Sequence, residues 1–205
     1  MTVAPEVIRQ LSSAGRAAFA AKGFLKAFYR STWHAYERTL HPLRHRALRR
    51  RLSRIRRPRR ILVLCYGNVC RSPYLAALLR RALPDVAVTS AGFVGSGRGV
   101  PPNALAIGQQ RGLDLSAHRS QLVSLWAITD ADLVIVMDPE QARRVAISFP
   151  IKRSKIVVAP DLTPQLEKVR RISDPWNQSV EAFQSSFAHL DRCAASLVAI
   201  IGKAD

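Results

Sequence analysis

The sequence predicts an α/β domain with a parallel sheet that carries helices on both faces. From residue 59 onward, short apolar runs rich in β-branched residues alternate with helical segments. The four runs that we expect to be strands cover residues 61–64, 86–90, 132–137 and 155–159. Such alternation is typical of parallel sheets, because each crossover returns the chain to the same end of the sheet. Ligands of these folds bind beyond the carboxyl ends of the strands.

Helical spacing of apolar residues, together with residues that typically begin or end helices, predicts the helices between these strands. The expected helices cover residues 73–83, 101–111, 119–126, 139–147 and 178–201. Ser72 and Pro73 form an N-cap and first-turn pair for the first helix, and Gly112 ends the second. A Gly-rich loop over residues 92–99 and a long loop over residues 160–177 complete the domain.

Composition limits the class of protein. A hydrophobic content of 48% in 205 residues supports a real core. The sequence has no uncharged apolar run long enough to predict a membrane-spanning helix. Three cysteines, two of them in one loop, do not form a secreted disulfide framework. A reducing cytoplasm therefore fits best.

The net charge of +18 is distributed unevenly along the chain. Residues 1–60 hold 16 Lys and Arg against 2 acidic residues, and the other 145 residues hold 16 against 12. We therefore expect a basic extension over residues 1–58, helical or partly disordered, and a nearly balanced domain over residues 59–205. Apolar residues at helical spacing predict amphipathic helices in the extension, with a break at Pro42.

The role of this extension stays open. The alternatives are a solvated arm, docking on an anionic membrane surface, binding of an acidic partner, packing on the catalytic domain or a second subunit, and an organellar transit peptide. Nucleic acid is the least favoured partner, because no stacking or base-reading motif accompanies the charge. A cytoplasmic protein with a peripheral membrane contact is the localisation that we expect.

One stretch between a strand and a helix carries the chemistry. Cys65 ends the first strand, Arg71 begins the following helix, and the spacing is Cys-x5-Arg-Ser. Five intervening residues let a loop wrap a tetrahedral anion with converging N–H groups, while the helix N-terminus adds partial positive charge. A small buried strand cysteine beside a solvated arginine is the alternative reading. The preceding strand, the internal Gly67-Asn68 pair and the following Pro73 argue against it.

In such a loop each residue type has a defined task. Thiolate is the nucleophilic form of Cys65, and the surrounding N–H groups favour it. Arg71 is placed to bind two equatorial oxygens of a phosphoryl group and to hold them through the transition state. Ser72 Oγ is placed to donate to the sulfur, which makes it a better leaving group when a phosphocysteine is hydrolysed.

The loop resembles the signature of the low-molecular-weight protein tyrosine phosphatase family, Cys-x-Gly-Asn-x-Cys-Arg-Ser-Pro. The matching residues are Cys65, Gly67, Asn68, Cys70, Arg71, Ser72 and Pro73. The similarity continues through residues 89–92, 112–119, 131–138 and 174–175. It implies a three-layer, doubly wound sheet of four parallel strands in the flavodoxin-like order 2-1-3-4.

The resemblance also implies hydrolysis of phosphotyrosine or small aryl phosphates through a phosphocysteine, without metal or cofactor. Phosphate, sulfate and other oxyanions are then expected ligands of the loop, contacted by the main chain at Gly67, Val69 and Cys70. Asp174, before Pro175, resembles the family's general acid, which later takes a proton from water. Taken alone, an Asp-Pro pair in a polar loop predicts only a turn.

Other residues are expected to support this centre. Asn68, Ser72, Ser90 and His118 resemble the network that stiffens the family's loop, and Asn tolerates a left-handed backbone. Asp138 is expected to orient the Arg71 guanidinium, to cap the helix that begins at Pro139, or to do both at once.

Three further side chains concern the substrate and oxidation. Tyr66 and Trp176 are expected to wall the slot for an aryl group. Animal members of the family carry paired tyrosines after the Asp-Pro, where this chain has Trp176-Asn177, so control by phosphorylation of that loop is not expected. Cys70 either protects Cys65 through a reversible disulfide or is a packed thiol. Cys193 reads as a core residue.

Two other functions compete with phosphatase activity. Arsenate reduction on the same scaffold requires a further cysteine pair, and the sequence has none between Cys70 and Cys193. A non-catalytic phosphate reader or membrane-associated scaffold would not need Cys65, Arg71, Ser72 and Asp174 together.

Overall fold

The computed structural model describes residues 13–55, 58–167 and 169–202. The chain divides into two compact units, residues 1–40 and residues 41–205. In the first unit the described residues form the amino-terminal part of α2, which spans Ser13–Ser53. The rings of Trp33 and Tyr36 lie 5.7 Å apart there, and both are about half exposed.

The second unit is built on a sheet of four parallel strands in the order β2-β1-β3-β4. The strands are β1 (Arg60–Cys65), β2 (Ala87–Gly92), β3 (Leu133–Val136) and β4 (Ile156–Val158). Both the parallel topology and the predicted order 2-1-3-4 are confirmed. Short runs of Val, Ile and Leu form these strands because both faces of the sheet are covered and every residue of β3 and β4 is buried.

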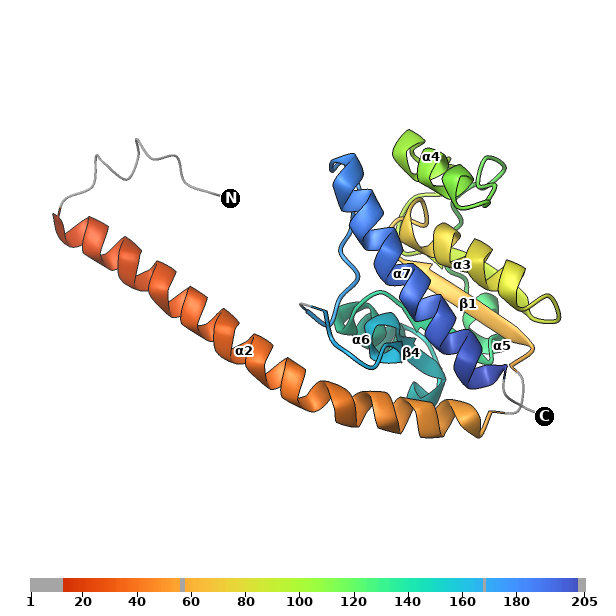
Figure 1. Ribbon diagram of the computed structural model, residues 1–205, viewed down its shortest axis with the longest axis horizontal. Coiled ribbons are helices and arrows are strands. Elements are labelled where there is room, and N and C mark those ends of the chain that lie inside the picture. The colour runs from red at the N-terminus through yellow and green to blue at the C-terminus, as the bar shows by residue number, and fades with distance from the viewer. Residues whose placement is uncertain (1–12, 56–57, 168, 203–205) are drawn as a thin grey trace. The chain divides into compact units, whose positions relative to one another are not determined.

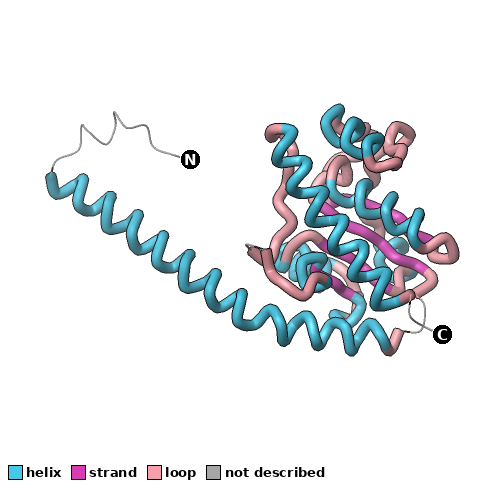
Figure 2. The backbone as a smooth tube through the Cα atoms, in the orientation of Figure 1, coloured by secondary structure: helices cyan, strands magenta, loops and turns pink. Residues whose placement is uncertain are grey.

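Helices cover both faces of the sheet and give the three layers (Figure 1). The core on one face joins the strands to α3 (Arg71–Ala82), α4 (Pro102–Gln110) and α7 (Val180–Ile201). The core on the other face joins them to α5 (Leu125–Asp130) and α6 (Pro139–Ser148). Two 3-10 turns, η1 (Arg153–Lys155) and η2 (Ala159–Leu162), flank β4. Figure 2 shows the strands enclosed between these helices, with the connecting loops at their ends.

The last part of α2 belongs to the second unit. Leu48 and Leu52 are buried in the same core as β1 and α7. His41 Nε2 donates to Thr163 O at 2.8 Å, His45 Nδ1 donates to Asp161 O at 3.0 Å, and Arg51 donates to Ile156 O at 3.0 Å. The compact unit thus begins at residue 41, whereas the sequence placed the boundary between residues 58 and 59.

The predicted break at Pro42 is wrong, because α2 continues through this residue. Proline inside a helix removes one main-chain hydrogen bond and costs about 3 kcal/mol. Burial of Leu48 and Leu52 on the domain offsets this cost and keeps residues 41–53 helical.

Leu52→Ala is expected to lower the free energy of unfolding by about 2 to 5 kcal/mol, because Leu52 is 0% exposed and its removal leaves a cavity. Leu43→Ala, on the same helix but at a residue that is 61% exposed, should change it by less than about 0.5 kcal/mol. Denaturant unfolding of both variants checks this. Equal effects would mean that this part of α2 is not part of the folded unit.

The prediction of a helix over residues 119–126 is also wrong at its start, because α5 spans Leu125–Asp130. Gln121 and Val123 instead extend beside the end of β2: Gly92 N donates to Gln121 O and Val123 N donates to Gly92 O, both at 2.8 Å. Helix α5 begins only at Leu125, where Ser124 Oγ caps it by accepting from Ala127 N at 3.1 Å. Tertiary pairing with β2 therefore overrides the local helical pattern.

In the parts of the chain that the structure describes, no helix combines the length and the apolarity that crossing a membrane would require.

Candidate active site

The candidate site is the loop that connects the carboxyl end of β1 to the start of α3. Cys65 is the last residue of β1, and its side chain is buried. Asn68 N lies 3.2 Å from Cys65 Sγ and donates to it, and Ser72 Oγ lies 3.1 Å from the same sulfur. Asn68 N therefore donates to a sulfur held at the strand end, and Ser72 Oγ is within reach to donate to the same sulfur when it is a thiolate.

The sequence predicted that Ser72 caps α3, and this prediction is wrong. The helix begins one residue earlier, at Arg71, and its cap position is Cys70, which makes no side-chain capping bond. The Ser72 hydroxyl is instead used within the loop, where it contacts Cys65 Sγ and accepts from Asn68 Nδ2 at 2.8 Å. The hydroxyl therefore serves the sulfur rather than the helix end.

Asn68 is the fully buried centre of the loop. Its φ is 51°, in the left-handed region that the sequence predicted for it. Nδ2 donates to Ser72 Oγ at 2.8 Å and to Ser90 Oγ at 2.9 Å, and Oδ1 accepts from Gln121 N at 2.8 Å. The tie from His118 goes to the main chain rather than to the Asn68 side chain, because Nε2 donates to Asn68 O at 2.8 Å.

Gly92 lets β2 approach this loop closely. It pairs with Cys65 in the register of β1 and β2. A Cβ atom at Gly92 would lie 2.8 Å from Asn68 N and 2.9 Å from Gly67 C, both main-chain atoms. Only glycine leaves room there for the left-handed turn of the loop.

Asn68→Ala is expected to destabilise the protein by about 2 to 4 kcal/mol, because three side-chain hydrogen bonds are lost and alanine is strained at positive φ. Asn177 provides a matched control, since its φ is 55° but it is exposed. Asn177→Ala should cost only about 1 kcal/mol. Unfolding curves of both variants test the network. Equal losses of unfolding free energy would mean that backbone strain alone explains the effect and that the side-chain hydrogen bonds of Asn68 contribute nothing measurable.

His118 is held neutral by its surroundings. Burial lowers the pKa of its imidazole, and the hydrogen bond to Asn68 O only partly opposes this. The unfolded chain therefore takes up the proton first as the pH falls below about 6.5. The stabilising contribution of the neutral ring is present above that pH and is lost as the pH falls towards the lower folded-state pKa.

His118→Gln is accordingly expected to flatten the fall in unfolding free energy between pH 7.5 and 5.5 (about one pH unit on either side of 6.5). Glutamine keeps a donor for Asn68 O but does not titrate. His189, whose pKa burial also lowers, contributes a slope of the same sign. The check is therefore the difference between the wild type and the variant, and parallel curves would contradict the assignment.

Arg71 is poised over the loop with its guanidinium almost fully buried. Nη1 donates to Ile172 O at 3.0 Å, and Nη2 pairs with Asp174 Oδ2. The Arg71 side chain is 4% exposed, against 43% for Asp174. A rigid cation therefore meets a carboxylate that faces solvent, and the long loop after β4 brings the two together.

The two readings of Asp138 are separated by its contacts. Its side chain accepts from Gln141 N at 2.8 Å and from Gln141 Nε2 at 3.1 Å, so it caps α6. Within residues 13–55, 58–167 and 169–202, no hydrogen bond or ion pair joins Asp138 to Arg71. Ile172 and Asp174 hold the guanidinium instead.

A cavity of about 130 Å³ opens at Cys65. Its walls bring together ten residues from the loop, the Gly-rich segment and the Asp-Pro segment: Cys65, Tyr66, Gly67, Val69, Cys70, Arg71, Val94, Arg98, Asp174 and Trp176. The rings of Tyr66 and Trp176 are about half exposed, as expected of walls for a flat group. A cleft of about 270 Å³ adjoins it, sharing Tyr66, Arg71 and Asp174.

Arg98 is a residue of this cavity that the sequence did not single out. Its Nη2 donates to Gly67 O and to Val94 O, both at 3.0 Å. Its guanidinium carbon lies 5.9 Å from the centre of the Trp176 ring. Arg98 thus links the Cys65 loop to one aromatic wall. The only feature of the sequence that could have indicated a role for Arg98 is its position as a single cation within a Gly-rich loop.

The other two cysteines are buried free thiols. Burial raises the pKa of Cys70 well above its usual range, so Cys70 stays protonated near neutral pH. Burial does the same for Cys193, which lies in the core as expected. The protective disulfide between Cys65 and Cys70 stays a prediction.

The fold and the Cys65 loop define a phosphatase of the low-molecular-weight class. A family model described as "Low molecular weight phosphotyrosine protein phosphatase" matches residues 60–205, so the chain belongs to this family of hydrolases. Among curated relatives, the probable low molecular weight protein-tyrosine-phosphatase EpsP of Ralstonia solanacearum is 38% identical over 134 residues, which cover 64% of this chain and 88% of EpsP. The Wzb phosphatase of Salmonella typhi is 33% identical, over 66% of this chain and 89% of its own.

Solved structures agree with this assignment. The tyrosine phosphatase AmsI of Erwinia amylovora superposes with a TM-score of 0.65 and 29% identity, covering 70% of this chain and 93% of its own. Wzb of Escherichia coli K30, solved in complex with phosphate, gives a TM-score of 0.65 and 28% identity over 74% of this chain and 97% of its own. The YwlE arginine phosphatase of Geobacillus stearothermophilus gives 0.62 and 29% identity over 69% and 92%.

Proposed function

We propose that this phosphatase hydrolyses phosphotyrosine and aryl phosphate monoesters through a phosphocysteine on Cys65. The observation that carries the proposal is the sulfur at the strand end, contacted by Asn68 N and Ser72 Oγ, with Arg71 and Asp174 beside it. Relatives were solved in complex with phosphate, sulfate and benzylphosphonate, which supports oxyanion binding by this chain.

In the first step the Cys65 thiolate attacks phosphorus and the bond from phosphorus to the aryl oxygen breaks. Asp174, which acts here in its protonated form, donates a proton to that oxygen, which leaves as a neutral phenol. Arg71 stays bound to Ile172 O through Nη1, gives up its pair with Asp174, and offers Nη2 and Nε to two phosphoryl oxygens, where it holds the charge that develops. The half-exposed Asp174 is free to make this exchange, because the main-chain oxygen of Ile172 keeps Arg71 in place.

In the second step Asp174, now a carboxylate, takes a proton from water while the water oxygen attacks phosphorus. The sulfur–phosphorus bond breaks, inorganic phosphate leaves, and the Cys65 thiolate returns. Ser72 Oγ, 3.1 Å from the sulfur, stabilises the charge that reappears there. Atoms and charge balance without any further reactant.

The substrate class is the finer part of the proposal, because YwlE, which shares the fold, is an arginine phosphatase. Tyr66 and Trp176 favour an aryl ester, since two flat rings line the cavity above Cys65. The test compares phosphotyrosine, phosphoserine and phosphoarginine in one peptide sequence. We expect kcat/KM to be highest for phosphotyrosine by at least about 100-fold. A preference for phosphoarginine would overturn the substrate assignment but not the phosphocysteine.

We further propose that the protein is cytoplasmic and that its basic extension contacts an anionic membrane surface. The 16 Lys and Arg against 2 acidic residues over residues 1–60 support this. Sedimentation of the full chain with vesicles of phosphatidylcholine, with and without phosphatidylglycerol, tests it. Binding only to the anionic vesicles, and its loss in high salt, is the expected result. Equal binding to both would contradict it.

A further inference from the structure

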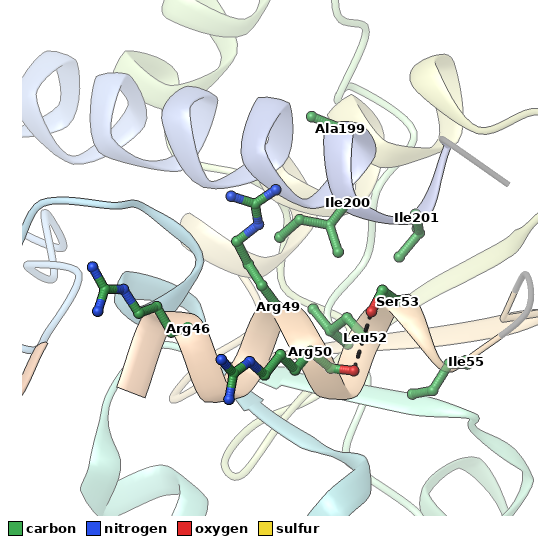
Figure 3. Close-up of a pocket in the computed structure, with 9 residues that line it drawn as sticks. All are labelled: Arg46, Arg49, Arg50, Leu52, Ser53, Ile55, Ala199, Ile200 and Ile201. Atoms are coloured by element: carbon green, nitrogen blue, oxygen red, sulfur yellow. Dashed lines mark hydrogen bonds between the residues drawn. The ribbon is translucent and has the colours of Figure 1, made fainter. Parts of the chain in front are cut away.

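The second unit contains a basic hollow away from Cys65, between the carboxyl-terminal turns of α2 and α7. We call it the α2–α7 pocket. Its volume is about 440 Å³, within the range of small-molecule sites. It shares no lining residue with the cavity at Cys65 or the cleft beside it. Figure 3 shows its residues, which come from α2, the turn that follows it, and α7: Arg46, Arg49, Arg50, Leu52, Ser53, Ile55, Ala199, Ile200 and Ile201.

The charge on this pocket has one sign. Arg46, Arg49 and Arg50 line it, are exposed, and recur at the helical spacing that places them on one face of α2. No aspartate or glutamate is among the lining residues. Across the described part of the chain, none of these three guanidinium groups has a hydrogen bond or an ion pair. The pocket is therefore complementary to an anion.

Other arginines of this unit do have hydrogen-bond partners, so the lack of partners is specific to the three arginines of the pocket. Arg51, on the same helix, donates to Ile156 O at 3.0 Å, and Arg170 pairs with Asp161 through two hydrogen bonds. These two guanidinium groups hold α2 and the loop after β4 on the domain. Arg46, Arg49 and Arg50 hold nothing within the described fold, and their donors remain available to a ligand.

The floor of the pocket is apolar. Leu52 and Ile201 are buried, and Ile55 and Ile200 are half-buried at its edge. Figure 3 shows Arg49 reaching from α2 towards α7, beside Ile200. Cations next to partly exposed aliphatic side chains suit a ligand with a charged end and an apolar end. An acidic peptide would satisfy the arginines but leave the isoleucine edge unused.

We infer that the α2–α7 pocket binds the head group of one anionic phospholipid at a bilayer surface. The arginines take the phosphodiester oxygens through paired N–H donors. Ile55 and Ile200 contact the glycerol and the first methylene groups. This inference rests on the proposed membrane contact and deepens it, because it places a defined lipid site in the catalytic unit itself.

The test uses the full-length protein and vesicles of phosphatidylcholine with 30 mol% phosphatidylglycerol (a composition on the order of anionic cell membranes). The pocket variant carries Arg46→Gln, Arg49→Gln and Arg50→Gln. The matched control carries Arg143→Gln, Lys152→Gln and Arg153→Gln, three exposed cations outside the pocket with no partner among the described residues. Both triples remove the same charge, and neither touches the Cys65 machinery.

We expect the pocket variant to lose about 100-fold in vesicle affinity, at about fivefold per arginine, and the control to lose less than about fivefold in total. Turnover of an aryl phosphate in solution should be unchanged in both, which shows that they fold. Soluble glycerol phosphate at millimolar concentration (about the Kd of a weak single-contact ligand) should not release the wild type, because it lacks the apolar part.

Other outcomes separate this inference from the broader proposal. Equal losses in the two triples would overturn the pocket and leave a diffuse electrostatic contact. No binding of the wild type to either vesicle would overturn both. Release by glycerol phosphate would make the ligand a free phosphate ester. Polyglutamate serves as a probe for an acidic protein partner. If the pocket variant lost binding to polyglutamate while its binding to vesicles stayed unchanged, the pocket would be assigned to an acidic protein and the lipid site would be contradicted.

Discussion

Replacing Cys65 with serine is expected to lower kcat for an aryl phosphate by at least about four orders of magnitude. Serine has a similar shape, but its hydroxyl is not ionised near neutral pH and is a much weaker nucleophile towards phosphorus than a thiolate. The donors around the sulfur, Asn68 N and Ser72 Oγ, remain in place. Binding of inorganic phosphate to the loop should therefore survive.

Cys70→Ser provides the matched control for this variant. Cys70 is in the same loop but is buried, and burial keeps its thiol protonated, so its role in turnover should be small. We expect kcat to change by less than about tenfold. Stopped assays with a chromogenic substrate measure both variants. Equal rates for the wild type and Cys65→Ser would exclude a phosphocysteine on Cys65.

The second large effect is expected at Asp174. Asp174→Asn should lower kcat by about 100- to 1000-fold, and most for substrates with poor leaving groups, because no proton is delivered to the departing oxygen. The same change removes the carboxylate that pairs with Arg71. Inorganic phosphate should then inhibit at lower concentration, because it no longer has to displace the Asp174 carboxylate from Arg71.

Asp138→Asn tests whether any nearby carboxylate would have this effect. Asp138 lines the adjoining cleft together with Arg71 and Asp174, but its hydrogen bonds cap α6. Asparagine is an equally good cap, so we expect kcat to change by less than about fivefold. Rates across a series of substituted phenyl phosphates measure the difference. A flat dependence on leaving group in Asp174→Asn would contradict its role as general acid.

Much of the site was predictable because it is local in sequence. The β1 strand, the turn at Gly67-Asn68 and the start of α3 lie within one short stretch, and side-chain chemistry alone indicates an anion-binding loop there. The left-handed Asn68 and the contact of Ser72 with the sulfur were expected for the same reason. The role of Ser72 as a helix cap was wrong, because the sulfur and Asn68 use its hydroxyl.

Features that depend on distant segments were less predictable. The pairing of Arg71 with Asp174 joins residues 103 positions apart, and it was not predicted, since the carboxylate expected beside Arg71 was Asp138. Arg98 reaches Gly67 O from a loop 31 residues away, and nothing in its local sequence indicates that contact. The apolar residues of α2 were visible at helical spacing, but their burial on the domain was not, because the surrounding arginines read as solvated.

The most direct test of the account is the chemical identity of the intermediate. Asp174→Asn, mixed with excess aryl phosphate and quenched at alkaline pH, should contain one added phosphoryl group, located by mass spectrometry on the peptide that carries Cys65. A Cys65→Ala variant, which has no side-chain nucleophile at this position, should contain none at that peptide. A phosphoryl group on any other residue, or rapid turnover by the wild type with no phosphorylated protein at any time, would contradict catalysis through Cys65.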